Sequence, residues 1–214
     1  MARALPRRLR RPAMIPVIVL AAGASRRMPE AKLLLELGGE PLLRRAARCA
    51  ADAEVGPVVV VIGGDEDLAR RALEGVPCAI VADPALPHRG MNASLAAGVA
   101  ALPPAAGGAV VLLADMPLVT AAAVRALVAR HRETGAPIVT TRYGEALAPP
   151  VLYDRALLAA LAAGGEGDGH GRALVRRHRA EAEVVDAPAH ALADVDVPAD
   201  LDRVRALLRA GRSA

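Results

Sequence analysis

The chain has 214 residues, of which 54% are hydrophobic, and this length suits one large domain with its own core. The formal net charge is +4, but residues 1–13 contain five arginines and no acid, so the remainder carries −1 once these five are subtracted. A near-neutral domain with 1% aromatic residues lacks the basic face and the stacking platform of nucleic-acid binding, and its apolar runs fall short of the roughly 20 residues of a membrane span.

The beginning of the chain imitates a secretory signal, because arginines precede the apolar run 13–22. However, Pro16 interrupts that run, and cleavage after it would destroy the motif that follows. We therefore expect residues 1–13 to be a flexible basic tail, or the product of an upstream start codon with Met14 as the true start. Residues 14–214 are expected to form a single domain of a cytoplasmic protein.

Short β-branched runs then alternate with Ala/Leu/Arg stretches of helical period. Strands are predicted at Val17–Leu20, Val58–Ile62, Ala79–Ala82, Val110–Leu113 and Pro137–Thr141. Helices are predicted at Pro41–Ala53, from the cap Asp65 to Leu73, near Ser94–Leu102, and from the cap Thr120 to about Glu133. Hydrophobic strands separated by helices indicate a three-layer α/β/α sandwich with a mostly parallel sheet, in which ligands bind at the carboxyl ends of the strands.

The pattern becomes less regular after Arg142. The elements expected there are a helix capped by Asp154 and ending at Ala163, a glycine-rich loop at Gly164–Gly171, a helix at Arg172–Glu181, short strands at Val184–Val185 and Ala191–Val195, and a closing helix at Pro198–Arg209.

A glycine-containing loop from Leu20 to Lys32 follows the first predicted strand. A triphosphate needs backbone N–H groups that small residues leave accessible, and it needs fixed cations for the charge on the leaving pyrophosphate. The loop fits neither the P-loop pattern nor the dinucleotide fingerprint. Lys32 is the only lysine in the chain. By itself this is as compatible with chance survival on the surface as with function, but its place in the loop favours function.

Residues Leu20–Leu34 resemble the signature L-A-[AG]-G-x-S-x-R-M-G-x-x-K-L-L of the molybdenum cofactor nucleotidyltransferases, part of the wider NTP transferase superfamily. Pro29 stands where the family has Gly, and the Ala-Ala-Gly form is more similar to the cytidylyltransferase branch than to the guanylyltransferase branch. The resemblance implies a nucleotide-diphospho-sugar transferase-like fold. It also implies that the loop residues that bind the nucleotide are Leu20, Ala21, Ala22, Gly23, Ser25, Arg27 and Lys32.

Three aspartates are candidate Mg²⁺ ligands. Asp115 directly follows a buried strand, where it is either a turn residue or a metal ligand, and the family's D-M-P or D-Q-P motif implies the ligand. The segment 193–201 is similar to the family's closing D-I-D-T-P-E-D-L, with Val197 in place of the capping Thr. Alternation sends Asp194 and Asp196 to one side, where two carboxylates need a nearby cation. For Asp196, an exposed acid ahead of a helix is nearly as good an interpretation.

The segment Gly90–Leu95 resembles the family's G-M-S-x-S-L, which lies near the base and sugar. The resemblance implies nucleotide contacts from Gly90, Asn92 and Ser94, with Asn92 replacing a Ser. Ser94 is equally compatible with an ordinary helix cap.

Two segments are expected at the acceptor. Ala148–Tyr153 stands where the family has G-H-P-V-L-F, which implies that Pro150 lies beside the acceptor. The stretch from Gly167 resembles a G-D-x-G-x-R loop, which implies acceptor contacts from Asp168 and Arg172. His170 replaces the second Gly of that loop and is interpreted as a solvated loop histidine.

The resemblance implies a Mg²⁺-dependent CTP:molybdopterin cytidylyltransferase with Arg27, Lys32 and Asp115 as catalytic residues. An acceptor phosphate is already ionised and needs no general base, so catalysis would rest on positioning and charge neutralisation. The expected partners are an NTP, a molybdopterin-type acceptor, and a molybdoenzyme or its chaperone. The alternatives are a transferase using GTP or a sugar or alcohol phosphate acceptor, and a non-catalytic nucleotide- or cofactor-binding protein.

Overall fold

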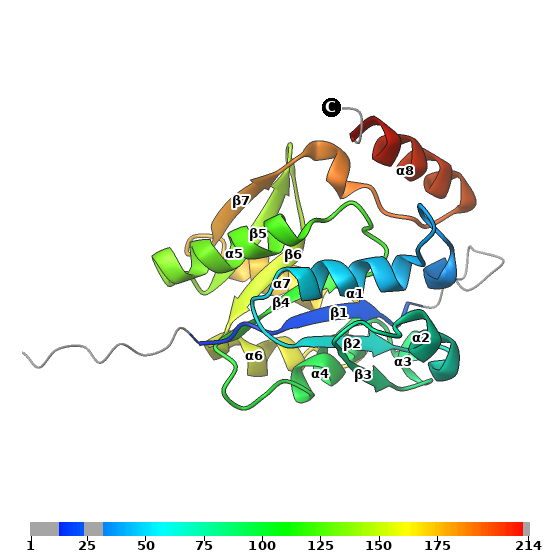
Figure 1. The fold of residues 1–214 in the computed structure, drawn as a ribbon. Helices are drawn as coiled ribbons and strands as arrows, with labels where there is room; N and C mark the ends of the chain where they lie inside the picture. Colours follow the sequence, from blue (N-terminus) through cyan, green and yellow to red (C-terminus); the bar gives the residue numbers. More distant parts are fainter. Residues whose placement is uncertain (1–12, 24–31, 212–214) are drawn as a thin grey trace, which may run out of the picture.

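The computed structural model describes residues 13–23 and 32–211. In these residues the chain forms a seven-stranded sheet of order β3-β2-β1-β4-β6-β5-β7 (Figure 1). The strands are β1 (Val17–Ala21), β2 (Val58–Ile62), β3 (Ala79–Ala82), β4 (Gly108–Leu113), β5 (Ile138–Tyr143), β6 (Ala146–Asp154) and β7 (Glu183–Ala187). Strand β6 runs antiparallel to β4 and β5, and the other neighbouring pairs are parallel.

Helices cover both faces of the sheet (Figure 1). One face packs against α1 (Leu42–Asp52), α2 (Glu66–Ala72), α5 (Ala121–Thr134) and α8 (Pro198–Gly211). The other packs against α3 (Leu86–Arg89), α4 (Met91–Ala100), α6 (Arg155–Ala162) and α7 (His170–Arg177). Because side chains alternate along a strand, Val19 of β1 joins the first core and Ile18 joins the second. The predicted three-layer α/β/α sandwich is therefore confirmed.

Local chemistry sets several helix starts where the sequence predicts them. The side chains of Asp65, Thr120 and Asp154 each accept a hydrogen bond from a backbone N–H in the first turn of α2, α5 and α6. In the described residues, no helix is both long enough and apolar enough to cross a membrane. The basic tail predicted for the start of the chain falls almost entirely on residues 1–12, outside the described residues.

Strand β6 is not among the predicted strands, because two consecutive prolines argue against a strand inside a sheet. A β-bulge accommodates them. Between two consecutive residues of β5, the pairing partner on β6 changes from Val151 to Ala148. The prolines between these partners lie outside the ladder, where they need no N–H.

The strand predicted at Ala191–Val195 is wrong. The chain forms a short 3-10 helix, η2 (Ala189–Leu192), and then an irregular segment. Ala191 and Val195 are nevertheless buried at 5% and 0% exposure. Their apolar character serves packing against the core and not pairing within the sheet. Helix α7 also starts two residues before the predicted helix and ends at Arg177.

Candidate active site

A buried lysine joins two carboxylates at the carboxyl edge of the sheet. Lys32 lies in η1 (Lys32–Leu34), and its Nζ donates to Oδ2 of Asp115 at 2.9 Å and to Oδ1 of Asp196 at 2.8 Å. Lys32 is 7% exposed, whereas the two carboxylate side chains are 28% and 42% exposed. Asp115 and Asp196, which follow Lys32 by 83 and 164 positions in the sequence, therefore form one charged cluster with it.

The charge of Lys32 is held by its partners. Burial lowers the pKa of Lys32, but the negative charge of Asp115 and hydrogen bonds to Asp196 and Asp115 outweigh burial and raise the pKa above its usual value. The ammonium therefore stays protonated. Because both carboxylates bond the same nitrogen, they lie close enough to repel each other without a cation between them.

Backbone contacts bring the end of the chain to this cluster. Asp115 follows β4, and its carbonyl oxygen accepts a hydrogen bond from the backbone N–H of Val195 at 3.0 Å. Asp196 comes directly after this anchored residue, so the contact holds it beside Asp115. The closeness of Asp115 and Asp196 thus has a specific structural cause.

Asp200 fixes the start of α8 and with it Asp196. Its Oδ2 accepts the backbone N–H groups of Asp196 and Val197, both at 2.9 Å. These two bonds are the main reason why the pKa of Asp200 lies below its usual value. An acid at the third helical position that reaches back to the cap is half of a capping box. The other half is absent because Val197 has no hydroxyl, and the N–H of Asp200 donates to the carbonyl of Val197 at 2.9 Å instead.

Two adjoining cavities open beside the cluster. The smaller, of about 500 Å³, is lined by half of the expected nucleotide-binding residues and by the first metal candidate, namely Leu20, Ala22, Gly23, Gly90, Ser94 and Asp115. The larger, of about 1400 Å³, is lined by the expected acceptor residues Asp168 and Arg172 and by Asp194 and Asp196. Leu20, Met91, Leu113 and Asp168 line both. The donor and acceptor candidates are therefore only partly separated, because Leu20 and Asp168 line both cavities and Asn92 lines the larger one.

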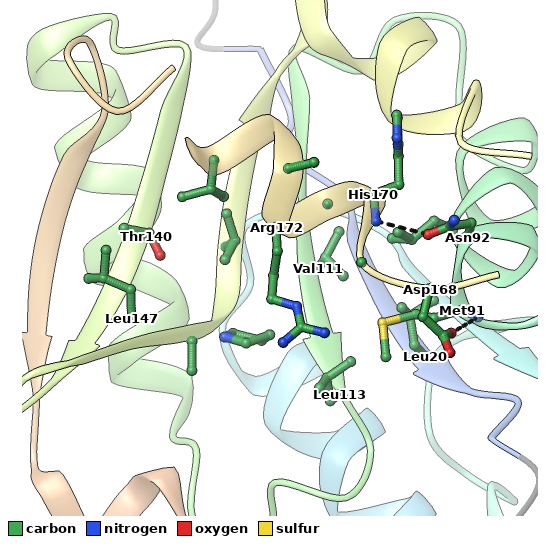
Figure 2. A pocket seen from close by; sticks show the side chains of 18 of the residues that line it. Leu20, Met91, Asn92, Val111, Leu113, Thr140, Leu147, Asp168, His170 and Arg172 are labelled. Carbon is green, nitrogen blue, oxygen red and sulfur yellow. Dashed lines mark hydrogen bonds between the residues drawn. The ribbon is translucent and has the colours of Figure 1, made fainter. Parts of the chain in front are cut away.

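Figure 2 shows the interior of the larger cavity. The guanidinium of Arg172 points from α7 into the cavity, toward Leu113 at the end of β4. Asp168 lies beside Met91 and accepts its backbone N–H at 2.7 Å. The facing wall is apolar and includes Leu20 and Val111.

Asn92 has a different partner from the one expected. Its side-chain amide donates to the carbonyls of Gly164 and Glu166, both at 3.3 Å, and its oxygen accepts the N–H of His170 at 3.1 Å. It therefore holds the 164–170 loop against α4, and contact with a base remains a prediction. Ser94 does not cap α4, since Gly90 holds the cap position. Ser94 is 4% exposed and lines the smaller cavity.

Three further expectations are modified. His170 is not a solvated loop residue, because it begins α7 half-buried with its Nε2 2.7 Å from the carbonyl of Ala160. Pro150 is buried, and its carbonyl accepts the hydroxyl of Thr141 at 2.7 Å, so the neighbouring Pro149 is the proline that lines the larger cavity. Ala21 is a buried part of β1 that lines neither cavity.

The remaining expectations on the nucleotide loop, Ser25, Arg27 and Pro29, lie outside the described residues. In the described part of the chain, no three His, Cys, Asp or Glu side chains gather closely enough to hold a metal ion. Asp194 therefore does not complete a three-carboxylate group with Asp115 and Asp196. The pair that meets at Lys32 still fits Mg²⁺, which takes one or two carboxylates and fills its shell with phosphate and water oxygens.

Sequence reasoning passes over two residues that the structure brings to the site. Arg176 lines the larger cavity one helical turn after Arg172, and this i, i+4 spacing was a readable signal. Asp200 holds the segment that carries Asp196, and an acid at the third position of a predicted helix was the signal for it.

The sheet topology and the likeness to a solved structure with a TM-score of 0.80 confirm the predicted nucleotide-diphospho-sugar transferase-like fold. Residues 17–184 match the MobA-like NTP transferase domain, so the chain belongs to that family. Asp196 and Asp200 lie beyond the matched range.

Several known proteins are similar to this chain. It is 28% identical to Rv0371c from Mycobacterium tuberculosis H37Rv, with a TM-score of 0.76 and coverage of 91% of this chain and 98% of that one. A manganese complex of Rv0371c gives 27% identity, a TM-score of 0.72, and coverage of 89% and 97%. The chain is also 33% identical over 148 residues to the bifunctional protein GlmU of Corynebacterium aurimucosum, covering 66% of this chain and 30% of GlmU. It thus spans about a third or less of the length of such curated relatives.

Proposed function

We propose that the chain is a nucleotidyltransferase that moves a nucleoside monophosphate from an NTP to a phosphate-bearing acceptor and releases pyrophosphate. The donor proposed is CTP and the acceptor molybdopterin. The observation that carries the proposal is the cluster of Lys32, Asp115 and Asp196 beside two adjoining cavities. A two-substrate transfer needs such an arrangement, with charge compensation where the reacting groups meet.

The residues of the smaller cavity suit a triphosphate. Gly23 and Gly90 leave space for close approach to the backbone. Lys32 does not line the cavity, but its ammonium bonds Asp115, which does, and so brings a positive charge close to it. Ser25 and Arg27 remain proposed phosphate contacts. Asp115 and Asp196 would hold a divalent cation, which supplies further charge neutralisation on the phosphates. A manganese complex of the related Rv0371c is in keeping with a cation of this kind.

The finer choice of substrates rests on two features. The Ala-Ala-Gly form of the loop favours CTP over GTP by its resemblance to the cytidylyltransferase branch. The larger cavity, at about 1400 Å³, exceeds the roughly 300–1000 Å³ of common small-molecule sites and has room for an acceptor of cofactor size.

The test is pyrophosphate release by the purified protein with Mg²⁺, comparing CTP with GTP and molybdopterin with glucose 1-phosphate. We expect release with CTP and molybdopterin. Lys32→Ala and Asp115→Asn should each lower kcat by on the order of a hundredfold, because each removes charge stabilisation at the transferred phosphates. The control is Arg70→Ala, which removes only an exposed ion pair with Glu66 on α2.

Each other result has a definite meaning. Wild-type rates in both variants would remove Lys32 and Asp115 from the mechanism. Release with glucose 1-phosphate alone would replace the molybdopterin assignment by a sugar phosphate. Tight binding of CTP–Mg²⁺ with no pyrophosphate from any acceptor would favour a non-catalytic binding protein.

A further inference from the structure

Two arginines of α7 line the larger cavity, and neither is paired with another residue of the part of the chain that the structure describes. Arg172 and Arg176 are one helical turn apart, exposed, and both line the cavity. Among the described residues neither forms an ion pair or hydrogen bond. By contrast, Arg89, which lines the smaller cavity, is paired with Glu166 at 3.2 Å and Asp83 at 3.9 Å. The α7 side of the larger cavity therefore presents two positive charges that are not neutralised by direct contact.

Helix α7 is held firmly enough to place these charges. Leu174, between the two arginines, is 2% exposed and packs in the core. At the start of the helix, Asn92 accepts the N–H of His170, and the ring of His170 lies 2.7 Å from the carbonyl of Ala160. The hydroxyl of Tyr153 donates to the carbonyl of Gly171 at 3.2 Å. Helices α4 and α6 and strand β6 thus fix one end of α7.

The other walls of the larger cavity determine what kind of molecule can carry the anionic group. Leu95, Val111 and Val151 supply apolar surface from α4 and the sheet. The carboxylates of Asp168, Asp194 and Asp196 line the same cavity and repel an anion from their sides, although Asp168 accepts the backbone N–H of Met91. A ligand with an uncharged body and one phosphate therefore fits with its phosphate against α7.

We propose that Arg172 and Arg176 together bind the phosphate of the acceptor, so that Arg176 sets the preference for a phosphomonoester over its dephosphorylated form. This inference rests on the proposed function, since it assigns a binding site to the second substrate. Planar guanidinium groups bind phosphate oxygens in pairs, and two of them one turn apart can grip a single group. The charge then serves both affinity and orientation of the attacking oxygen.

The test uses the full chain and the acceptor, molybdopterin or glucose 1-phosphate, that supports pyrophosphate release. Arg172→Gln and Arg176→Gln should each raise KM for the acceptor at least about tenfold while KM for CTP stays unchanged. Arg176→Lys should recover part of the loss because it restores the charge without the fork. Arg177→Gln is the matched control, because Arg177 is an exposed neighbour on α7 that does not line the cavity.

Calorimetric titration of both acceptors in the absence of CTP separates this inference from the proposed function. Binding that Arg176→Gln weakens and Arg177→Gln does not, without any pyrophosphate release, would support the arginine pair and reject the transfer activity. If Arg176→Gln and Arg177→Gln both release pyrophosphate at the wild-type rate with the same KM for the acceptor, the arginine pair is rejected and the transfer activity is retained. If the wild-type protein neither binds nor uses either phosphate compound, both proposals fail.

Discussion

At the scale of single residues, Lys32 holds the two carboxylates that the proposed cation would use. Its ammonium lies 2.9 Å from Asp115 and 2.8 Å from Asp196, and its pKa is raised by these partners. A divalent cation that binds the same pair has to compete with an ammonium already there. Competition of this kind would keep the affinity for a free cation low until a triphosphate offers Lys32 another partner.

Replacing Lys32 by Met tests this competition. The variant keeps an apolar stem and removes the ammonium that lies between Asp115 and Asp196. We expect Mn²⁺ to bind at least about tenfold more tightly than to the wild type in the absence of nucleotide, because it relieves the repulsion of the two acids. Electron paramagnetic resonance of free Mn²⁺ measures this affinity, and pyrophosphate release should fall in the same variant.

Thermal unfolding with and without Mn²⁺ provides the cross-check. The rise in Tm caused by Mn²⁺ should be larger for Lys32→Met than for the wild type or for Arg70→Ala, because the more tightly bound ligand stabilises more. Weaker or unchanged binding of Mn²⁺ by Lys32→Met would mean that the lysine helps to hold the cation and does not compete with it.

The sequence singles out Lys32 by its uniqueness and Asp115 by its place after a strand. It does not show that Lys32 bonds Asp196, because that contact spans 164 positions and depends on the anchoring of Val195 to Asp115. The partners of Asn92 could not be predicted either, because they lie 72 to 78 positions away in the sequence. Side-chain chemistry was readable from local sequence, whereas long-range pairing required the fold.

At the scale of elements, the start of α8 controls where Asp196 lies. The pKa of Asp200 is depressed by hydrogen bonds from the backbone N–H groups of Asp196 and Val197. A group with a depressed folded pKa contributes stability that is present above its unfolded pKa of about 3.9 and is lost as the pH falls toward the folded value. The helix start should therefore loosen below about pH 4.

Replacing Asp200 by Ala should have the same effect at neutral pH. We expect a loss of about 1 kcal/mol in unfolding free energy at pH 7, and a difference from the wild type that shrinks as the pH falls below about 4 toward the depressed folded pKa, where the wild-type acid itself becomes protonated. Urea unfolding at the two pH values measures both. Asp202→Ala is the control, since the side chain of Asp202 is 78% exposed and, among residues 13–23 and 32–211, pairs only with Arg205. Equal losses in the two variants would exclude the capping role.

Elements with regular hydrophobic patterns were predicted within a few residues, and β2 and β3 match their predicted bounds. Strand β6 was not predicted, because its two prolines break the hydrophobic pattern of a strand. Only the bulge against β5 accommodates them, and the bulge is not visible in the sequence. The predicted strand at 191–195 failed for the opposite reason, since its apolar residues pack against the core without pairing. The sequence therefore predicts that these residues are buried, but it does not predict the backbone conformation in which they are buried.

At the scale of the whole molecule, the two cavities depend on one close contact between distant segments. Gly90, between α3 and α4, has a φ of +83°, and a Cβ added there would lie 2.5 Å from the carbonyl oxygen of Gly167. That carbonyl accepts the backbone N–H of Asn92 at 2.9 Å, while the N–H of Gly167 donates to the backbone carbonyl of Arg89 at 2.8 Å. Met91 and Asp168, the residues that follow the two glycines, line both cavities. The glycine contact therefore sets the geometry of donor and acceptor sites together.

Replacing Gly90 by Ala should weaken both sites at once. The added Cβ forces the 164–170 loop away from α4, so we expect a higher Kd for CTP–Mn²⁺ and a higher acceptor KM, besides a stability loss of at least about 1–2 kcal/mol from the positive φ. The control is Gly135→Ala, which has a φ of +68° at the end of α5 and no atom within 4 Å of an added Cβ. Gly135→Ala should lose stability but retain both affinities, because it also places a side chain at a positive φ, in the milder left-handed region with a ψ of 16°, and causes no collision. If the two variants bind CTP–Mn²⁺ and the acceptor equally well, the sites are independent of the glycine contact and the larger and smaller cavities are not coupled through it.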